Sequence, residues 1–263
     1  VTLFADLGTY RGTLLPLKAS GHTFAGEVDK QPSAWDNIEM RIDEKCHSLH
    51  DLLRLGIHVG DFISIDPQPD VMENGFIVSR HLDDKAGVAV LLGAVKAVID
   101  AGVELPVDCH PLFTISEEVG CGASAILHGD IAEMLTLDNG TTAPGQNSRE
   151  YGVTVCMADM SGPFDYHLTH RILQLCQEFE IPHQRDIFRY YRSDSAAAVE
   201  AGNDLRTALA TFGVDASHGW ERIHWSALES LAQLVALYMQ SPQLYERDRQ
   251  PRSSLPGFST MPG

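Results

Sequence analysis

From residue 76 onward the sequence alternates short apolar runs with longer helical segments, and this alternation restricts the fold more than any other feature. Short apolar runs bounded by glycine or polar residues are typical of buried strands, and glycine or proline closes the helical segments. Strands and helices in this order form a mostly parallel sheet with helices on both faces, so we predict an α/β protein. The expected strands lie at 75–78, 107–115, 134–137, 153–157, 187–191 and 206–212, and the expected helices at 84–101, 165–180, 193–201 and 224–239.

The first 75 residues have a different pattern, in which glycine, proline and aspartate separate short strand-like runs. This pattern predicts a small β-rich domain with one short helix near 48–55. We therefore expect three parts: a β-rich domain at 1–75, a catalytic α/β domain at 76–247 and a flexible tail at 248–263. The tail is rich in proline, serine and glycine, which is common for mobile chain ends.

The charge balance excludes several classes of partner. The chain has 19 basic and 36 acidic side chains and a formal net charge of −17, which argues against nucleic acid and anionic membranes. The same carboxylates suit multivalent cations. The most apolar stretch, 87–99, contains Lys96 and is too short to span a bilayer. Five widely spaced cysteines without a CxxC pair indicate reduced thiols and a cytoplasmic protein.

Two pairs of adjacent carboxylates follow predicted strands. Asp83 and Asp84 stand between the strand at 75–78 and the next helix, where they could be a solvated loop residue and a helix N-cap, or a metal ligand and a cap. Glu117 and Glu118 end an apolar run, where two buried carboxylates would be unfavourable without a partner. Neighbouring strand residues point in opposite directions, so one glutamate could bind a metal while the other faces a water or substrate. The alternative is a strand end whose two glutamates are simply solvated.

Three further polar residues follow other strands. Asp138 begins a segment of turn-forming residues, so a simple turn is an alternative to a ligand role. Asp194 could cap the following helix or orient other groups. His218 lies in a polar, glycine-rich loop and not on an apolar face, which favours a ligand role over a core histidine.

Asp83, Glu118, Asp138 and His218 each follow a different predicted strand of one parallel sheet. Ligands of open α/β sheets bind at the carboxyl ends of the strands, so these four side chains can converge at one edge. A set of carboxylates with one imidazole suits divalent zinc, cobalt or manganese. Two such ions that share a carboxylate would hold a bridging hydroxide, and Glu117 would be placed to move its proton.

Four segments together resemble metallopeptidase family 42, the tetrahedral, glutamyl and deblocking aminopeptidases. Their order and spacing match over most of the chain, and the combination of the first two is specific. The segments are Ser79-Arg80-His81-Leu82-Asp83-Asp84-Lys85-Ala86-Gly87, Ile115-Ser116-Glu117-Glu118-Val119-Gly120, Leu137-Asp138 and Ser217-His218-Gly219-Trp220-Glu221.

The resemblance implies a role for each matching residue. Asp83 corresponds to the carboxylate that bridges two metals, and Glu117 to the general base. Glu118 and Asp138 each correspond to a terminal ligand of one metal, and His218 to a ligand of the other. The family further implies a zinc-peptidase-like fold with a small inserted β domain, a short peptide or amide substrate, and dimers that build dodecamers.

Longer phrases narrow the resemblance to the branch associated with the bacterial osmoprotectant N-acetylglutaminylglutamine amide. They lie at 15–22, 138–148 and 188–194.

Asp84 matches a family position with a structural role.

One motif of the family has no match. Members carry a histidine in a His-x-Asp motif upstream of the inserted domain, whereas the triplets His81-Leu82-Asp83 and His128-Gly129-Asp130 lie elsewhere. The chain opens at Val1 without a methionine, so we expect that the segment with this histidine is missing. One metal would then lack a ligand, and the site in this chain would be partly filled or empty.

The sequence therefore predicts a dinuclear metal-dependent aminopeptidase or related amidohydrolase. Two alternatives remain at this stage. One is an inactive fragment or assembly subunit that keeps the fold. The other is a glycoside hydrolase, which would use two carboxylates but would leave four metal-type ligands unexplained.

Overall fold

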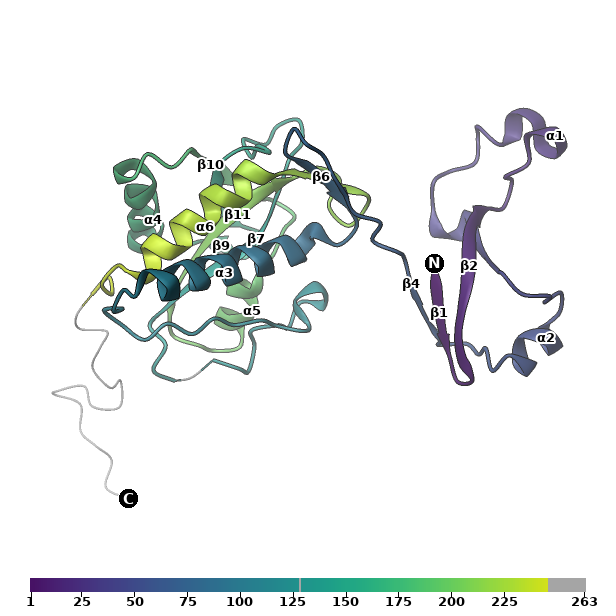
Figure 1. Ribbon diagram of the computed structural model, residues 1–263, viewed down its shortest axis with the longest axis horizontal. Coiled ribbons are helices and arrows are strands. Elements are labelled where there is room, and N and C mark those ends of the chain that lie inside the picture. Colours follow the sequence, from purple (N-terminus) through teal and green to yellow (C-terminus); the bar gives the residue numbers. More distant parts are fainter. Residues whose placement is uncertain (128, 246–263) are drawn as a thin grey trace, which may run out of the picture. The chain divides into compact units, whose positions relative to one another are not determined.

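Figure 1 shows the computed structural model of the protein, which describes residues 1–127 and 129–245. The chain separates into two compact units, Val1–Gln68 and Pro69–Gly263. His128 and the predicted tail at 248–263 lie outside the described residues. Among the described helices, none has the length and apolar content required to cross a membrane.

The first unit contains one antiparallel sheet in the order β3-β2-β1-β4. Its short α2 helix begins as the sequence predicts, because the Ser48 hydroxyl accepts a hydrogen bond from the Asp51 backbone at 3.2 Å. The strands are β1 (Thr2–Ala5), β2 (Gly8–Pro16), β3 (Ile38–Ile42) and β4 (Phe62–Ser64). The helical segments are α1 (Gly21–Phe24), η1 (Ala25–Glu27), η2 (Trp35–Asn37) and α2 (Leu49–Arg54).

The second unit is built on a central sheet in the order β10-β8-β11-β7, with the short β9 paired to β8. β10 runs parallel to β8 and β11 runs parallel to β7, whereas β8 and β11 are antiparallel. The sheet is therefore mixed, and helices flank it, which confirms the α/β fold class. The strands are β7 (Glu133–Thr141), β8 (Val153–Asp159), β9 (Gly162–Pro163), β10 (His183–Ile187) and β11 (Arg206–Val214).

A second, smaller sheet of this unit has the order β12-β6-β5, and its pairings are antiparallel. In it, Glu221 at the start of β12 lies opposite Ser79 at the end of β6. This pairing brings the segment before β12 next to the segment after β6. The strands are β5 (Asp70–Val71), β6 (Phe76–Ser79) and β12 (Glu221–His224).

Helices cover both faces of the central sheet. α3, α4 and α6 contribute to the larger apolar cluster on one face, and α3 and α6 lie side by side (Figure 1). α5 contacts β7 and β11, and its Ser195 hydroxyl is 2.7 Å from that of Thr136. The helices are α3 (Leu82–Ala101), α4 (Tyr166–Glu178), α5 (Asp194–Glu200) and α6 (Trp225–Met239), with a 3₁₀ turn η3 (Glu117–Val119).

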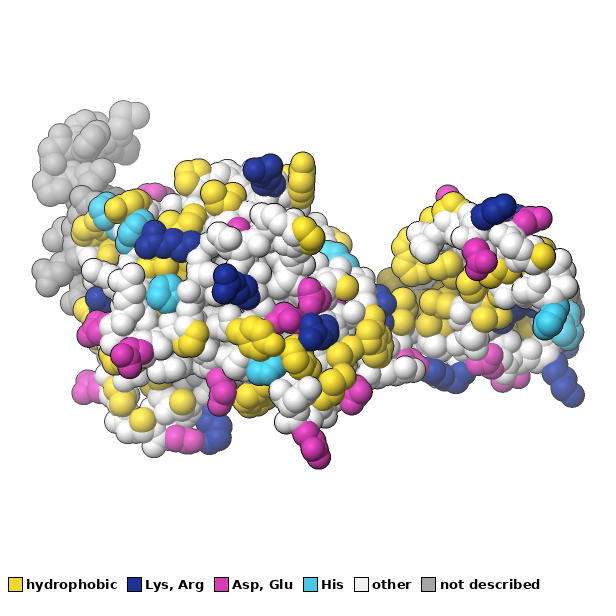
Figure 2. Space-filling view, turned by 90° about the horizontal axis from the view of Figure 1, so that it is seen from above, with side chains coloured by type: hydrophobic (Ala, Val, Ile, Leu, Met, Phe, Trp, Pro, Cys, Tyr) yellow, Lys and Arg dark blue, Asp and Glu magenta, His cyan; other side chains and the backbone are white. Residues whose placement is uncertain are grey.

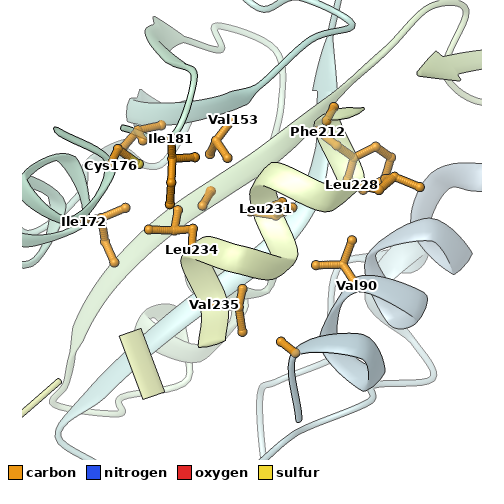
Figure 3. Close-up of a cluster of buried hydrophobic side chains, with 14 of the residues drawn as sticks. Val90, Val153, Ile172, Cys176, Ile181, Phe212, Leu228, Leu231, Leu234 and Val235 are labelled. Atoms are coloured by element: carbon orange, nitrogen blue, oxygen red, sulfur yellow. The ribbon is translucent and has the colours of Figure 1, made fainter. Parts of the chain in front are cut away.

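Alternation along β11 divides the core between the two faces, because successive strand side chains point in opposite directions. Phe212 belongs to the larger cluster with residues of α3, α4 and α6 (Figure 3), whereas Leu209 belongs to a smaller cluster with Phe188. Close-packed interiors of this kind are rigid, so the loops at the edge of the sheet begin and end on a rigid frame.

Two predicted strands are wrong. Residues 107–115 form no strand, because no strand among the described residues pairs with their backbone. Ile115, which the prediction placed in a buried strand, is 99% exposed. The strand predicted at 187–191 lies earlier, as β10, and ends at Ile187. The residues after it instead form a loop, with Phe188 buried and Tyr190 exposed.

Candidate metal centre and active site

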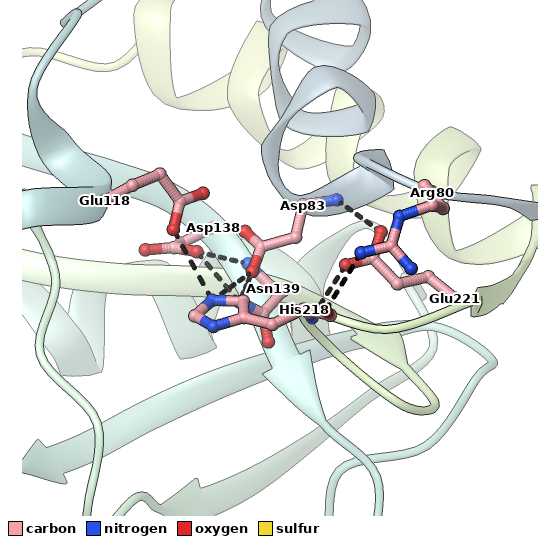
Figure 4. A network of polar contacts seen from close by, with 7 residues as sticks. All are labelled: Arg80, Asp83, Glu118, Asp138, Asn139, His218 and Glu221. Atoms are coloured by element: carbon pink, nitrogen blue, oxygen red, sulfur yellow. Dashed lines mark hydrogen bonds and ion pairs between the residues drawn. The ribbon is translucent and has the colours of Figure 1, made fainter. Parts of the chain in front are cut away.

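The four predicted ligands come from four different segments, and their side chains point toward one another (Figure 4). Asp83 lies at the start of α3 and Glu118 in the turn η3. Asp138 lies inside β7, one edge strand of the central sheet, and His218 in the loop between β11 and β12. Segments that are distant in the sequence therefore form one acidic cluster.

Asp83, Glu118 and His218 form the first potential metal-binding group. The Nε2 atom of His218 lies 3.3 Å from Asp83 Oδ2 and 3.4 Å from Glu118 Oε2. The Asp83 side chain is 4% exposed, while those of Glu118 and His218 are 54% and 72% exposed. One buried carboxylate and two accessible ligands make a site that opens to solvent on one side.

Asp83, Asp84 and Asp138 form the second group, with one ligand atom of each within 4.8 Å of the others. Asp138 is buried, and its Oδ1 accepts a hydrogen bond from the Asn139 backbone at 2.6 Å. The side chain of Asn139 donates to Asp83 Oδ2 at 2.8 Å. Asp83 thus belongs to both groups, as a carboxylate shared between two ions would.

The carboxylates of the second group repel one another in a buried place. Burial, followed by the charge of Glu118, raises the pKa of Asp83 to about 6. Burial and the charges of Asp138 and Asp83 raise the pKa of Asp84 to about 10, and burial raises the pKa of Asp138 well above its usual value. Asp84 Oδ1 is also buried and, within the described residues, accepts no hydrogen bond. Divalent cations would neutralise this cluster, so these residues fit a metal site.

Glu117 has properties that suit a general base. Burial, and then the charge of Asp194, raise its pKa to about 7. A carboxylate that titrates near neutral pH is matched to proton transfer at that pH. Glu117, Glu118, Asp83 and His218 line one cavity of about 710 Å³, which gives a substrate room beside the ligands.

Two further loops contribute to the wall of this cavity. The loop after β10 contributes Arg189 and Tyr190 to the cavity wall, and the loop after β7 contributes Gln146. Asp186, in β10, fixes the loop after β7 to the end of that strand, because its Oδ2 accepts hydrogen bonds from the Gln146 side chain and from the Asn147 backbone at 2.9 and 2.8 Å.

Three buried polar residues near the ligands were missed or underrated from the sequence. Asn139 was taken for a turn former, yet it lies inside β7 and contacts two ligands. Asp194 accepts hydrogen bonds from Thr114 Oγ1 at 2.6 Å and from the backbone of Ala123 at 2.9 Å, and thereby holds both ends of the loop that carries Glu117. Glu221, which is fully buried, ends the segment Ser217-His218-Gly219-Trp220-Glu221 that resembles the family, but no role was assigned to it from the sequence.

Comparison with known proteins shows the family to which the chain belongs. The sequence model of the M42 glutamyl aminopeptidase family matches residues 1–234. The chain belongs to the M42 aminopeptidase family. It is therefore a hydrolase, and M42 enzymes are metal-dependent peptidases.

Among individual M42 relatives, the chain is 40% identical over 237 residues to YhfE of Bacillus subtilis (strain 168), named as a candidate aminopeptidase. That match covers 89% of this chain and 68% of YhfE.

Solved structures of M42 peptidases show the same fold. The TET aminopeptidase of the marine sediment archaeon Thaumarchaeota archaeon SCGC AB-539-E09 aligns with a TM-score of 0.78 and 19% identity, over 91% of this chain and 69% of that one. The TET1 peptidase of Pyrococcus horikoshii, described as assembling into a tetrahedron or a large octahedral shell, aligns with a TM-score of 0.75 and 22% identity. This second match covers 90% of this chain and 70% of the TET1 peptidase chain.

Proposed function

We propose that this M42 protein is a dinuclear metal-dependent aminopeptidase that releases N-terminal residues from short peptides or a related amide. The observation that carries the proposal is the position of Asp83, which belongs to both potential metal-binding groups. A single carboxylate between two sets of ligands is the arrangement required by two ions that act together on one substrate.

In this proposal Asp83, Glu118, Asp138 and His218 would hold the ions, with Asp83 shared between the two, Glu118 and Asp138 as terminal carboxylates and His218 as the imidazole. When bound, divalent ions supply Lewis-acid polarisation of the scissile carbonyl and neutralise the clustered carboxylates. Carboxylates and one imidazole favour zinc, with cobalt or manganese as alternatives.

Glu117 moves the proton. Its carboxylate accepts a proton from the attacking water and then donates it to the nitrogen of the leaving amine. Two features of the structure support this role. Glu117 lines the same cavity as the ligands, and its raised pKa places the gain and the loss of a proton near neutral pH.

Further parts of the proposal rest on the family and on sequence motifs. We propose a homo-oligomer, because the related TET1 peptidase is described as a tetrahedral or octahedral assembly. All five cysteines are free thiols, which supports a cytoplasmic location. We also propose that Val1–Gln68 is a small β-rich domain and that the catalytic domain begins at Pro69, because β5 pairs with β6 of the second unit. The phrases shared with the osmoprotectant branch make N-acetylglutaminylglutamine amide a substrate to test.

The decisive experiment measures release of N-terminal residues from a panel of short peptides and from the amide named above. The wild-type protein is assayed with added zinc, with cobalt or manganese, and with excess chelator. We expect activity that the chelator abolishes and a divalent ion restores.

Glu117→Gln should lower kcat by roughly 100- to 10,000-fold with a smaller effect on metal content, since it removes only the proton carrier. Glu229→Gln is the matched control, because Glu229 is exposed on α6 and lies outside the site. Full activity in chelator, or in Glu117→Gln, contradicts the proposal. A folded, metal-loaded chain without activity on the whole panel would instead support an assembly subunit.

A further inference from the structure

Glu221 is the most buried charged side chain beside the metal ligands, with 1% of its surface exposed. Each oxygen of its carboxylate accepts one backbone hydrogen bond (Figure 4). Oε2 accepts from the backbone N–H of Asp83 at 3.0 Å, and Oε1 accepts from the backbone N–H of His218 at 3.0 Å. One carboxylate therefore holds the backbones of two proposed ligands that lie on different loops.

The two amides need such an acceptor because both loops have irregular backbones. His218 has a left-handed φ of 63°, which is unfavourable by about 1–3 kcal/mol for a residue other than glycine. Asp83 has φ −79° and ψ 109°, so it is not helical although it lies at the start of α3. Neither backbone N–H can join a regular helix or strand ladder in these conformations, and a buried N–H requires a partner.

The small sheet sets the position of Glu221. Pairing of β12 with β6 places Glu221 opposite Ser79. The chain leaves β6 toward Asp83 and enters β12 from His218, so Glu221 stands where the two loops meet. A buried carboxylate is unfavourable unless it is well hydrogen-bonded, and hydrogen bonds to a charged acceptor are stronger than neutral ones. The arrangement thus favours one fixed spacing of the two loops.

We propose that Glu221 is a positioning residue for the metal centre, which sets the distance between Asp83 and His218 by holding both backbone amides. The inference rests on the proposed function, because it takes these two residues as metal ligands. Glu221 itself binds no metal in this scheme. Its effect is to hold the two ligands in place before an ion arrives, so that binding requires less ordering of the loops.

The test compares metal affinity with stability in the whole chain. Glu221→Gln keeps the shape of the side chain but offers one oxygen acceptor, so one of the two amides loses its partner. Glu221→Asp keeps the charge but is one methylene shorter, so it cannot reach both amides. The matched control is Asp165→Asn, because Asp165 also accepts from a backbone amide, that of Leu168 at 2.8 Å, but lies at the start of α4 outside both ligand groups.

Zinc affinity is measured by competition with a chromophoric chelator, folding by thermal melts, and protection of the two loops by hydrogen exchange. We expect both Glu221 variants to bind zinc on the order of 10- to 100-fold more weakly than wild type. We also expect faster exchange in the peptides that contain residues 83 and 218. Asp165→Asn should melt earlier but bind zinc as wild type does.

A folded Glu221 variant that binds zinc as tightly as wild type overturns the inference and leaves the proposed function intact. A wild-type chain that binds no divalent ion at either ligand group, as opposed to one ion in place of two, overturns the proposed function and the metal part of the inference together. Hydrogen exchange separates the two cases, because the loss of protection at both loops in the variants does not require a metal.

Discussion

Asp84 offers a sharp test of the electrostatics of the metal centre. Burial and neighbouring carboxylates raise its pKa to about 10, whereas an aspartate in an unfolded chain titrates near 3.9. Between these values the folded metal-free protein keeps a proton that the unfolded chain releases. The folded state therefore loses stability relative to the unfolded state as the pH rises from about 4 toward 10.

The magnitude follows from this single proton. Each pH unit between the two pKa values lowers the free energy of unfolding by about 1.4 kcal/mol. Asp84→Asn removes the titrating group. The stability of the variant relative to wild type should therefore rise with pH, by on the order of 2–3 kcal/mol between pH 5 and pH 7 in the absence of metal.

The assay is urea unfolding in excess chelator at several pH values, repeated with saturating zinc. Asp165→Asn is the control, since Asp165 lies outside the cluster and pairs with Arg206 at 2.7 Å. With zinc bound, the gain of Asp84→Asn over wild type should shrink or reverse, because the ion stabilises the ionised carboxylates. A stability difference that does not change with pH in the metal-free protein would refute this account.

Two other features give direct predictions. Burial raises the pKa of Cys156 and of Cys176 to about 12, so both thiols stay protonated at pH 8. Both should therefore react with iodoacetamide far more slowly than the exposed Cys121. Mass spectrometry of the labelled peptides measures the three rates. Gly213→Ala should lower the free energy of unfolding by roughly 1–3 kcal/mol in a urea titration, because its Cβ would approach the backbone oxygen of Arg149; an unchanged midpoint would contradict this packing.

The sequence predicted that the four proposed ligands meet, although part of the reasoning was wrong. All four of these residues were expected to follow strands of one parallel sheet. In the structure only Asp138 and His218 are placed by that sheet, on β7 and after β11. Asp83 follows β6 of the smaller sheet. Glu118 lies in the 3₁₀ turn η3, and the described residues between α3 and this turn form no strand. The identity and spacing of the residues in the motifs were what predicted that the four side chains meet. Strand formation at 107–115 depends on pairing with a distant part of the backbone, which a local sequence pattern cannot reveal.

Polar residues that support the ligands were harder to predict. Asn139 and Gly140 follow Asp138 in a segment that is typical of turns, yet they continue β7. Gly140 is needed there for a different reason, since a Cβ would lie 2.4 Å from Thr211 Oγ1. The same residue types serve tight turns and close strand contacts, and only the neighbouring strand distinguishes the two.

The hydrogen bond from Asp83 to Glu221 joins residues that are 138 positions apart in the chain. During synthesis on the ribosome, Asp83 emerges long before the carboxylate that will hold it. An incomplete chain can therefore expose acidic residues without assembling them into a site. If the proposed site binds an ion, capture of that ion would mark the point at which β12 has joined β6, and a cell that supplies the ion would stabilise finished molecules in preference to interrupted ones.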